Sequence, residues 1–528
     1  MVQIKLTLPL GYTDADVRAA VVESLPVAEG ELLSYEILWR RLDTSEKPPK
    51  RYLCRIALSF SPEREAGLLK MRKRVSLYEP FSLTVPRVKS TTRPVVVGAG
   101  PAGLFCTLIL AEAGLSPILI ERGLPVEERI RSVDRFRITR HPDPESNVQF
   151  GEGGAGTFSD GKLKCGKRDA HQWKVLSTLV TLGAPEEILI SDAPHLGTDR
   201  LYTIMRNMRR HLLSLGAEIR FSTRLVGITH EGSKLRSLTV EHDGREEELP
   251  TDTLFLATGH SAEDTFRLLD SIGVAMEQRP FGIGVRIEHP QSLVNEWAYG
   301  KDHPDDLPAA SYRFVTHLPN GRSVYSFCMC PGGSVVAAAS LEGRLVTNGM
   351  SNSARDGNNA NAAFLVSVSP ADFGSPHPLA GIEYQKRIER AAFVAGGEDF
   401  SAPVCRMEDF VGTRESTSLG CVTPTYPLGY RFASPDAYLS PELCGSLRAA
   451  IADFDLWQSG FYFPDAILTG AETRSTSPVR ILRDECGASV THRGIYPIGE
   501  GAGYAGGIVS SAVDGLRSAL KFLKNLEN

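Results

Sequence analysis

The chain has 528 residues, of which 42% are hydrophobic and 23% are charged, and its formal net charge is −5. This length predicts two to four domains, and the ordinary composition predicts a globular protein. The weak negative charge excludes a global field that would recruit nucleic acid or an anionic membrane. No stretch reaches the roughly 20 apolar residues that a membrane-spanning helix needs.

The nine cysteines are scattered, and none of them forms a CxxC or a zinc-binding pattern. This usage favours a reducing compartment. The start of the chain, residues 1–5, alternates apolar and polar side chains, which argues against a signal peptide. We therefore expect a cytoplasmic protein without a membrane span and without a metal site.

The first 90 residues predict a small unit of their own, residues 1–90. Alternation and helical spacing predict the order βαββαβ, which is typical of a ferredoxin-like fold. Thr13 is the expected N-cap of the first helix. The expected strands are 2–8, 32–42, 52–60 and 75–85, and the expected helices are 14–25 and 62–74. Residues 86–94, which are polar and bracketed by prolines, predict a linker.

An α/β pattern follows the linker. A buried strand at 95–97, an apolar helix at 102–113 and a strand at 118–120 predict a βαβ opening. Further strands are expected at 218–221 and 254–257, with helices at 200–214 and 508–526. Residues 270–480 are rich in Gly, Pro and Ser, which predicts a mixed or antiparallel β domain for a substrate.

The βαβ opening carries a glycine fingerprint. Residues 98–103, GAGPAG, match GxGxxG directly after a strand and at the start of a helix. In this pattern Gly98 makes the tight turn, Gly100 lets a pyrophosphate approach the backbone, and Gly103 lets helix and strand pack closely. Glu121 lies at the end of the next strand and favours a free ribose 2′-hydroxyl, which leaves NAD or FAD as the cofactor.

Three later segments favour FAD. Residues 254–260, LFLATGH, look like the second signature of flavoproteins that bind a dinucleotide. Glu500 lies where such proteins place an acid on the ribityl chain, and the glycine pair 506–507 opens the last helix, whose positive end can stabilise a reduced flavin. The glycine-rich loop 147–163 predicts close approach of the backbone to the pyrophosphate and the flavin.

These motifs define the expected fold and cofactor contacts. We expect an α/β fold with α+β additions, in which a three-layer Rossmann-like FAD-binding domain spans 91–275 and 481–528, and a mixed β substrate domain spans 276–480. The residues expected to contact FAD are Gly98, Gly100, Pro101, Ala102, Gly103, Glu121, Arg122, Gly153, Gly154, Thr157, Phe158, Ser159, Asp160, Lys162, Leu225, Thr258, Gly259, Gly499, Glu500, Gly506, Gly507 and Ile508.

The chain resembles the bacterial family of FAD-dependent proteins, also described as NAD(FAD)-utilizing dehydrogenases. The resemblance implies a FAD domain of the glutathione-reductase type with an inserted or C-terminal substrate domain, and it is similar to single-Rossmann flavoproteins such as the geranylgeranyl reductases. It leaves the substrate open. The motifs that carry it are GAGPAGL (98–104), NVQFGEGGAGTFSDGKL (147–163), FCMCPGG (327–333), LVTNGMS with ARDGNNANAA (345–363), ETRSTSPVRI (472–481) and GEGAGYAGGI (499–508).

Candidates for chemistry are fewer. Cys328 and Cys330 lie two apart on an expected strand, and they are either a redox-active thiol pair near the flavin or two small buried residues. A disulfide between residues i and i+2 of a regular strand would be strained. His260 is either an acid–base group or a packing residue. The arginines considered as holders of an anionic substrate are Arg286, Arg355 and Arg474.

Only one GxGxxG is present, so NADH or NADPH is expected to visit without a Rossmann site of its own. Ferredoxin or the substrate itself are the alternative donors. The leading hypothesis is an FAD-dependent oxidoreductase that transfers a hydride between a small molecule and flavin N5. The sequence names neither the substrate nor the oligomeric state.

The alternative hypothesis is a flavoprotein that binds RNA or a protein partner through its N-terminal unit. Residues 1–90 hold 15 Lys and Arg against 11 Asp and Glu. Tyr35 and Trp39 are expected to share one face of a central strand, with Tyr52 on the other face. The basic residues gather at Arg40, Arg41, Lys47, Lys50, Arg51 and Arg55 and at Lys70, Arg72, Lys73 and Arg74. A solvated face on a docking unit is the simpler interpretation.

Overall fold

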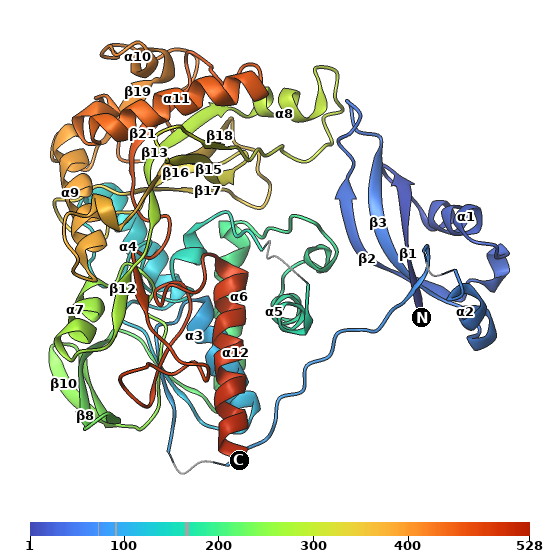
Figure 1. Ribbon diagram of the computed structural model, residues 1–528, viewed down its shortest axis with the longest axis horizontal. Helices are drawn as coiled ribbons and strands as arrows, with labels where there is room; N and C mark the ends of the chain where they lie inside the picture. Colours follow the sequence, from blue (N-terminus) through green and yellow to red (C-terminus); the bar gives the residue numbers. More distant parts are fainter. Residues whose placement is uncertain (72, 90–91, 164–167, 528) are drawn as a thin grey trace.

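A computed structural model gives the arrangement of the chain (Figure 1). It describes residues 1–71, 73–89, 92–163 and 168–527. Arg72 of the basic cluster and part of the expected linker, residues 90–91, lie outside the described residues. Among the described residues, none of the helices is both long and apolar enough to cross a bilayer.

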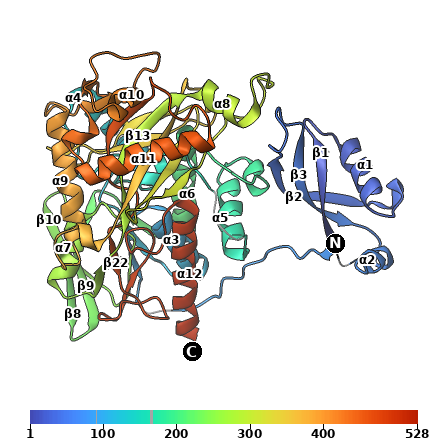
Figure 2. The same ribbon diagram turned by 45° about the horizontal axis from the view of Figure 1, so that its top comes forward.

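The N-terminal unit is an antiparallel sheet with two helices on one face (Figures 1 and 2). The strand order β2-β3-β1-β4 has the two middle strands at β3 and β1. The predicted order βαββαβ is confirmed. The elements are β1 (Val2–Pro9), α1 (Asp14–Ser24), η1 (Glu29–Glu31), β2 (Ser34–Leu42), β3 (Arg51–Ser59), α2 (Pro62–Leu68) and β4 (Ser76–Leu77).

The core of this unit follows from strand alternation. Every second side chain of β1, from Val2 to Leu8, is buried against the helices. Thr13 caps α1 as predicted, and it forms a capping box with Asp16. The expected strand 75–85 shortens to two residues, because Pro80 soon follows and cannot donate to a sheet ladder.

One predicted feature of the N-terminal unit is wrong. The register of β2 against β3 shifts between Ile37 and Trp39, so a bulge turns Trp39 away from the face of Tyr35. Tyr35 and Tyr52 instead pack against the same core. The strand also lies at the edge of the sheet and not at its centre. The stacking platform that an RNA-binding sheet would use is therefore not formed.

A five-stranded parallel sheet follows, in the order β23-β11-β5-β6-β7. One face is covered by helices α3, α5, α6 and α12, and the other by the antiparallel sheet β10-β9-β8 and by α7. Together they make the three layers that were predicted. The strands and helices are β5 (Val95–Val97), α3 (Pro101–Glu112), β6 (Ile118–Ile120), α4 (Val126–Thr139), η2 (Ala155–Phe158), α5 (Ala170–Thr181), η3 (Glu186–Leu189), α6 (Thr198–Ser214), β7 (Glu218–Arg220), β8 (Thr223–Glu231), β9 (Lys234–His242), β10 (Arg245–Pro250), β11 (Leu254–Leu256), α7 (Glu263–Ser271), β23 (Ile495–Pro497) and α12 (Ile508–Glu527).

The third region is built on a seven-stranded sheet in the order β14-β15-β18-β13-β21-β19-β20. Its pairs are antiparallel except β19 with β20, so the predicted mixed sheet is confirmed. The central strand β13 is buried on both faces. The elements are β12 (Met276–Gln278), β13 (Phe281–Pro290), α8 (Gln291–Tyr299), β14 (Val315–His317), β15 (Ser323–Cys330), β16 (Ser334–Ala337), β17 (Thr347–Met350), β18 (Asn359–Val368), η4 (Pro370–Asp372), α9 (Ala380–Ala395), β19 (Ala402–Arg406), α10 (Met407–Val411), β20 (Tyr430–Phe432), η5 (Pro435–Ala437), α11 (Pro441–Trp457), β21 (Ile467–Glu472) and β22 (Val479–Ile481).

The N-terminal unit docks on the rest of the chain through the edge strand β2. The Arg40 N–H donates to the Ile190 carbonyl at 2.7 Å, and the Asp192 N–H donates back to the Arg40 carbonyl at 3.0 Å. The Trp39 indole N–H donates to the Asp192 carboxylate at 3.1 Å. The edge of the sheet is therefore partly covered by another segment of the same chain.

Candidate functional site

The glycine fingerprint forms the turn between β5 and α3. Gly98 has φ +106°, and a Cβ there would lie 2.4 Å from the Ala257 carbonyl oxygen. A Cβ on Gly103 would overlap the Gly98 carbonyl oxygen. Both glycines are therefore required by contacts within the protein, and they bring the segment after β11, with Thr258 and Gly259, against the turn.

Gly100 is different, because the protein leaves space beside it. A Cβ there would meet only the Gly154 Cα, at 3.8 Å. Gly100 is also the N-cap of α3, and no side chain caps this helix end. The first turn, with Pro101 and Ala102, thus presents open backbone and the positive end of the helix dipole. A phosphate group fits such a cradle.

The glycine loop 147–163 lies directly on this turn. The Gly153 N–H donates to the Ala99 carbonyl at 2.8 Å. A Cβ on Gly156 would lie 3.0 Å from the side chain of Ile508, at the start of α12. The loop therefore joins the N-termini of α3 and α12, which are more than 400 residues apart in sequence.

The segment after β23 also packs against the β5–α3 turn and the segment after β11. A Cβ on Gly499 would lie 2.6 Å from the Ala102 Cβ, and one on Gly501 would overlap the Gly259 carbonyl oxygen. Gly506 and Gly507, before α12, meet no close neighbour. The fingerprint, the loop and the two later motifs thus converge on one place, as expected for parts of a single site.

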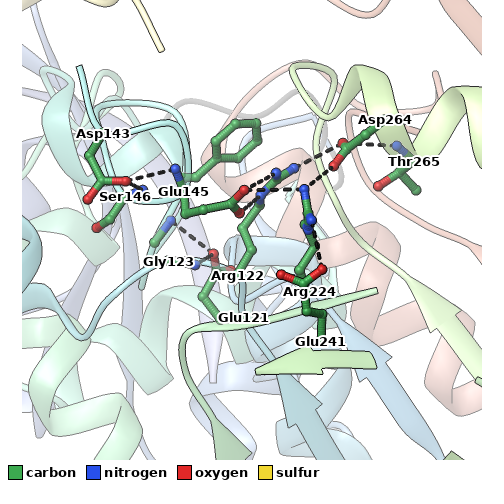
Figure 3. A network of polar contacts seen from close by, with 12 residues as sticks. Glu121, Arg122, Gly123, Asp143, Glu145, Ser146, Arg224, Glu241, Asp264 and Thr265 are labelled. Carbon is green, nitrogen blue, oxygen red and sulfur yellow. Dashed lines mark hydrogen bonds and ion pairs between the residues drawn. The ribbon is translucent and has the colours of Figure 1, made fainter. Parts of the chain in front are cut away.

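Glu121 joins the β5–α3 turn to the glycine loop, and Figure 3 shows its bond with Gly123. Its carboxylate is buried and accepts hydrogen bonds from the backbone N–H groups of Ala99 at 2.7 Å, Gly123 at 2.9 Å and Gly151 at 2.9 Å. Two of these bonds reach Oε1 and one reaches Oε2. A carboxylate oxygen accepts about two bonds, so Oε2 retains capacity for a ligand hydroxyl.

Arg122 is held by acidic side chains (Figure 3). Its guanidinium donates to Glu145 at 2.7 and 3.0 Å and to Asp264 at 3.0 Å. It also stacks on the Phe150 ring, with 4.4 Å between the guanidinium carbon and the ring centre. Arg122 therefore fixes the glycine loop to the helix α7, and its fork is already occupied.

Arg129 was not predicted as a site residue, yet it organises the loop. This fully buried guanidinium, on α4, donates to five backbone carbonyls at 2.7–3.3 Å. Burial lowers the pKa of Arg129 to about 10. An arginine inside an otherwise polar helix gives no sequence signal, because its five acceptors come from a loop fixed only by the tertiary fold. The acceptors are the carbonyls of Asn147, Val148, Gly151, Glu152 and Gly154.

The other predicted loop residues make local contacts. Thr157 is buried, and its hydroxyl donates to the Glu152 carbonyl at 3.2 Å. Phe158 packs beneath Arg129, and the Ser159 hydroxyl donates to the Gly156 carbonyl at 2.7 Å. Leu225, on β8, is buried in the hydrophobic core between the sheets. Its position explains its burial without a ligand.

Glu500 follows β23 at the wall of the site. Burial raises the pKa of Glu500 to about 7, although 28% of its side-chain surface stays open to solvent. The His260 Nδ1 lies 3.5 Å from the Glu500 Oε1. Burial lowers the pKa of His260 to about 4, so the neutral imidazole is the stable form at pH 7. These two groups can share a proton at this position.

The three arginines considered for an anionic substrate are each paired with a carboxylate. Arg286 is fully buried and forms two hydrogen bonds of 3.0 Å with Glu472. Arg474 is paired with Glu389 at 2.9 and 3.0 Å, and Arg355 with Asp160. Their guanidinium groups are therefore already bonded to carboxylates of the protein, and this structural role accounts for their presence here.

The two cysteines lie at the end of β15, where the register shifts between Phe327 and Cys330. Cys328 has φ +42°. The Cys330 thiol donates to the Cys328 carbonyl oxygen at 3.2 Å. The Lys162 ammonium is 3.7 Å from the Cys330 sulfur and 3.0 Å from the Asp160 carboxylate. The cysteines therefore meet the end of the glycine loop.

Comparisons with known proteins agree with the resemblance. A sequence model of the family described as FAD-dependent protein, C-terminal domain-like, matches residues 280–475. A Clostridium beijerinckii relative, named Uncharacterized protein, is 42% identical over 514 residues, which is 96% of this chain and 95% of that protein.

Among solved structures, the flavin-dependent brominase Bmp2 is 12% identical, with a TM-score of 0.39 over 83% of this chain and 80% of its own. A flavoprotein/dehydrogenase from Cytophaga hutchinsonii is 11% identical, with a TM-score of 0.34 over 82% and 79%. On the strength of the full-length relative and the family match, the chain belongs to the family of FAD-dependent proteins that share this C-terminal domain.

Proposed function

We propose that this protein is an FAD-dependent oxidoreductase that acts on a small molecule. The observation that carries the proposal is the open cradle at Gly100, where a bare helix N-terminus meets the glycine loop and the segment after β23. Gly98 and Gly103 are required by contacts within the protein, whereas Gly100 faces space that the protein does not fill. A turn with a purely structural role would need only Gly98 and Gly103 to be glycine.

The chain's own residues suit the parts of FAD. The N-terminus of α3 would hold the pyrophosphate, and the free capacity of Glu121 Oε2 would accept a ribose hydroxyl. Glu500 and the N-terminus of α12 would lie along the ribityl chain and the flavin. When bound, FAD supplies two-electron transfer, with hydride exchange at N5. His260 and Glu500 are placed to hold or move the accompanying proton.

The electron donor is proposed to be NADH or NADPH that binds transiently, with ferredoxin or the substrate itself as alternatives. The test is an anaerobic titration of the purified protein with each nucleotide, followed in the flavin absorbance bands. Bleaching supports a nicotinamide-dependent reductase. An oxidised flavin that ignores both nucleotides points to the other donors. A colourless protein that takes up no added FAD contradicts the proposal.

A single substitution separates the cofactor role of the cradle from its packing role. In Gly100→Ala the new Cβ meets no protein atom closer than 3.8 Å, and the backbone φ of −75° suits alanine. We expect an unchanged free energy of unfolding for the apoprotein and at least a roughly tenfold loss of FAD affinity, since the methyl group occupies the approach of the pyrophosphate. Equal FAD affinity of variant and parent, measured by fluorescence titration, would contradict the assignment.

A further inference from the structure

We propose that Cys328 and Cys330 are a redox-active pair that cycles between a dithiol and an intrachain disulfide. The proposal deepens the proposed function, since it gives the oxidoreductase a thiol relay and a thiol or disulfide as its partner class. Its geometric basis does not depend on a bound flavin.

The backbone brings the two sulfurs together. In a regular strand, residues i and i+2 are about 6.6 Å apart, near the long limit for a disulfide. Here β15 leaves its register against β18 after Phe327 and regains it at Cys330. The left-handed φ of +42° at Cys328 turns the chain at this bulge. The Cys330 sulfur consequently folds back to 3.2 Å from the Cys328 carbonyl oxygen, so the spacing of a regular strand does not apply to this pair.

The surroundings of the pair are cationic. The Lys162 ammonium is 3.7 Å from the Cys330 sulfur, and the Arg286 guanidinium donates to the Cys328 carbonyl at 3.0 Å. Asp160 and Glu472 are the nearest acids, and they are ion-paired to these same two cations. The hydrogen bond from Cys330 lowers the pKa of Cys328 well below its ordinary value against the effect of burial, and Lys162 and Arg286 lower it further.

The two thiols are not equivalent. Cys328 is partly exposed, whereas Cys330 is fully buried. The hydrogen bond to Cys328, followed by burial, raises the pKa of Cys330 well above its ordinary value. A partly exposed cysteine beside a buried one is the arrangement of an attacking and a resolving cysteine.

The chemistry balances with a small disulfide as the oxidant. The Cys328 thiolate attacks one sulfur of the disulfide, which forms a mixed disulfide and releases one thiolate. Cys330 then loses its proton and attacks the Cys328 sulfur, which forms the intrachain bond and releases the second thiolate. The protein loses two hydrogens, and the small disulfide becomes two thiols.

The pair also adjoins the candidate cofactor site. Lys162 and Asp160 belong to the end of the glycine loop, and this loop also contacts Ile508 at the start of α12. A dithiol in this position is placed to exchange electrons with a group held between those segments. In a reducing cytoplasm, the proposed location of this protein, the dithiol would be the resting form.

Purified protein equilibrated in redox buffers of reduced and oxidised glutathione tests the proposal. Both cysteines fall in one tryptic peptide, residues 323–344, which contains no other cysteine. After alkylation of free thiols, we expect this peptide to carry two alkyl groups under reducing conditions. Under oxidising conditions it should carry none, and its mass should be two hydrogens below that of the free dithiol peptide. Retention of both alkyl groups at every potential would overturn the proposal.

Single variants separate attack from resolution. Cys330→Ser should accumulate a mixed disulfide at Cys328, whereas Cys328→Ser should form none, because the remaining thiol is buried. Cys421→Ser, at an exposed cysteine, is the matched control and should leave the switch unchanged. A mixed disulfide that forms on Cys328→Ser as fast as on Cys330→Ser would contradict the assignment.

The charge of Lys162 has its own readout. Lys162→Gln should move the midpoint of Cys328 alkylation to higher pH, since it removes a nearby positive charge, while Lys174→Gln should not. Flavin content is measured on the same samples. A protein that holds FAD and accepts electrons but never forms the disulfide leaves the oxidoreductase proposal intact and removes the thiol relay. A protein that forms the disulfide but binds no FAD leaves the thiol pair intact and removes the oxidoreductase proposal.

Discussion

At the scale of single residues, Arg129 shows how much of the candidate site depends on one side chain. Its five acceptors are backbone carbonyls of the glycine loop, which has no regular structure of its own between Asn147 and Gly154. Buried carbonyls need donors, and here a guanidinium supplies them where a sheet or helix would otherwise do so.

Arg129→Met should therefore destabilise the protein strongly. It leaves buried carbonyls without donors, and we expect a loss of at least about 3 kcal/mol in the free energy of unfolding. Arg131→Met, on the exposed side of the same helix, should change it by less than about 0.5 kcal/mol. Urea unfolding of both variants checks this, and similar losses for the two would refute the organising role.

The raised pKa of Glu500 predicts a pH dependence. In the folded protein the group holds its proton up to about pH 7, whereas its ordinary pKa is 4.5. Its contribution to stability is therefore complete below pH 4.5 and is lost as the pH rises through 7.

Glu500→Gln should remove this dependence. Relative to the variant, the parent should lose on the order of 2 kcal/mol of unfolding free energy between about pH 5 and pH 8. Urea unfolding of the pair at both pH values measures the difference. The other buried acid with a pKa of about 7, Glu152, is present in both proteins and cancels in the comparison. A difference that does not change with pH would contradict a raised pKa at Glu500.

At the scale of elements, the packing of α3 on the β5 turn depends on a missing side chain. Gly103→Ala would overlap the Gly98 carbonyl and press on the Ala257 Cβ at 3.3 Å. We expect the helix to shift. This shift should lower the free energy of unfolding by roughly 1–3 kcal/mol and should also reduce the retention of FAD.

Gly445→Ala is the matched control for that substitution. Gly445 lies within α11, and a Cβ there meets nothing within 4 Å. The change should stabilise the protein by about 0.5–1 kcal/mol, because glycine is a poor helix former. Thermal unfolding of both variants tests the contrast, and a stabilised Gly103→Ala protein would be inconsistent with the close approach seen here.

The elements also show what sequence could and could not predict. Apolar patterning correctly predicted β1, α1, β5, α3 and α12, and motif matching predicted that the glycine segments meet. Bulges defeated the same reasoning in β2 and β15, since one extra residue reverses every later side chain. For that reason Trp39 was expected on the wrong face, and the closeness of Cys328 to Cys330 was missed.

Sequence reasoning was also limited by ion-pair partners that lie far apart along the chain. Arg286 and Arg474 were considered as substrate holders because a guanidinium can hold an anion bidentately. Their carboxylates, Glu472 and Glu389, come from other strands and helices. The fate of a buried charge is decided by such tertiary neighbours, which a single sequence does not reveal.

At the scale of the whole molecule, the N-terminal unit is held by backbone and side-chain contacts of β2 and the residues after it, beyond its linker. Arg168 donates to the Leu38 carbonyl of β2 and to the Ser191 carbonyl, the latter at 2.9 Å. Trp39 adds its bond to Asp192. Removing these two side chains should weaken the docking, although the Arg40 backbone bonds remain, and the unit should stay folded because its core is separate.

The double variant Arg168→Met with Trp39→Phe tests this expectation. We expect a larger radius of gyration by small-angle scattering and faster tryptic cleavage after Lys89. Lys5→Met, on an exposed position of β1, is the control and should behave as the parent. An unchanged scattering profile for the double variant would show that other contacts hold the unit.

The covalent connection between Leu77 and Val95 gives the docking contact a further property (Figure 1). A tethered surface meets its partner at an effective concentration on the order of millimolar, whatever the protein concentration in the cell. A contact far too weak to hold two separate proteins together would therefore remain closed most of the time here. The same unit can detach and return repeatedly, and dilution will not separate it from the rest of the chain.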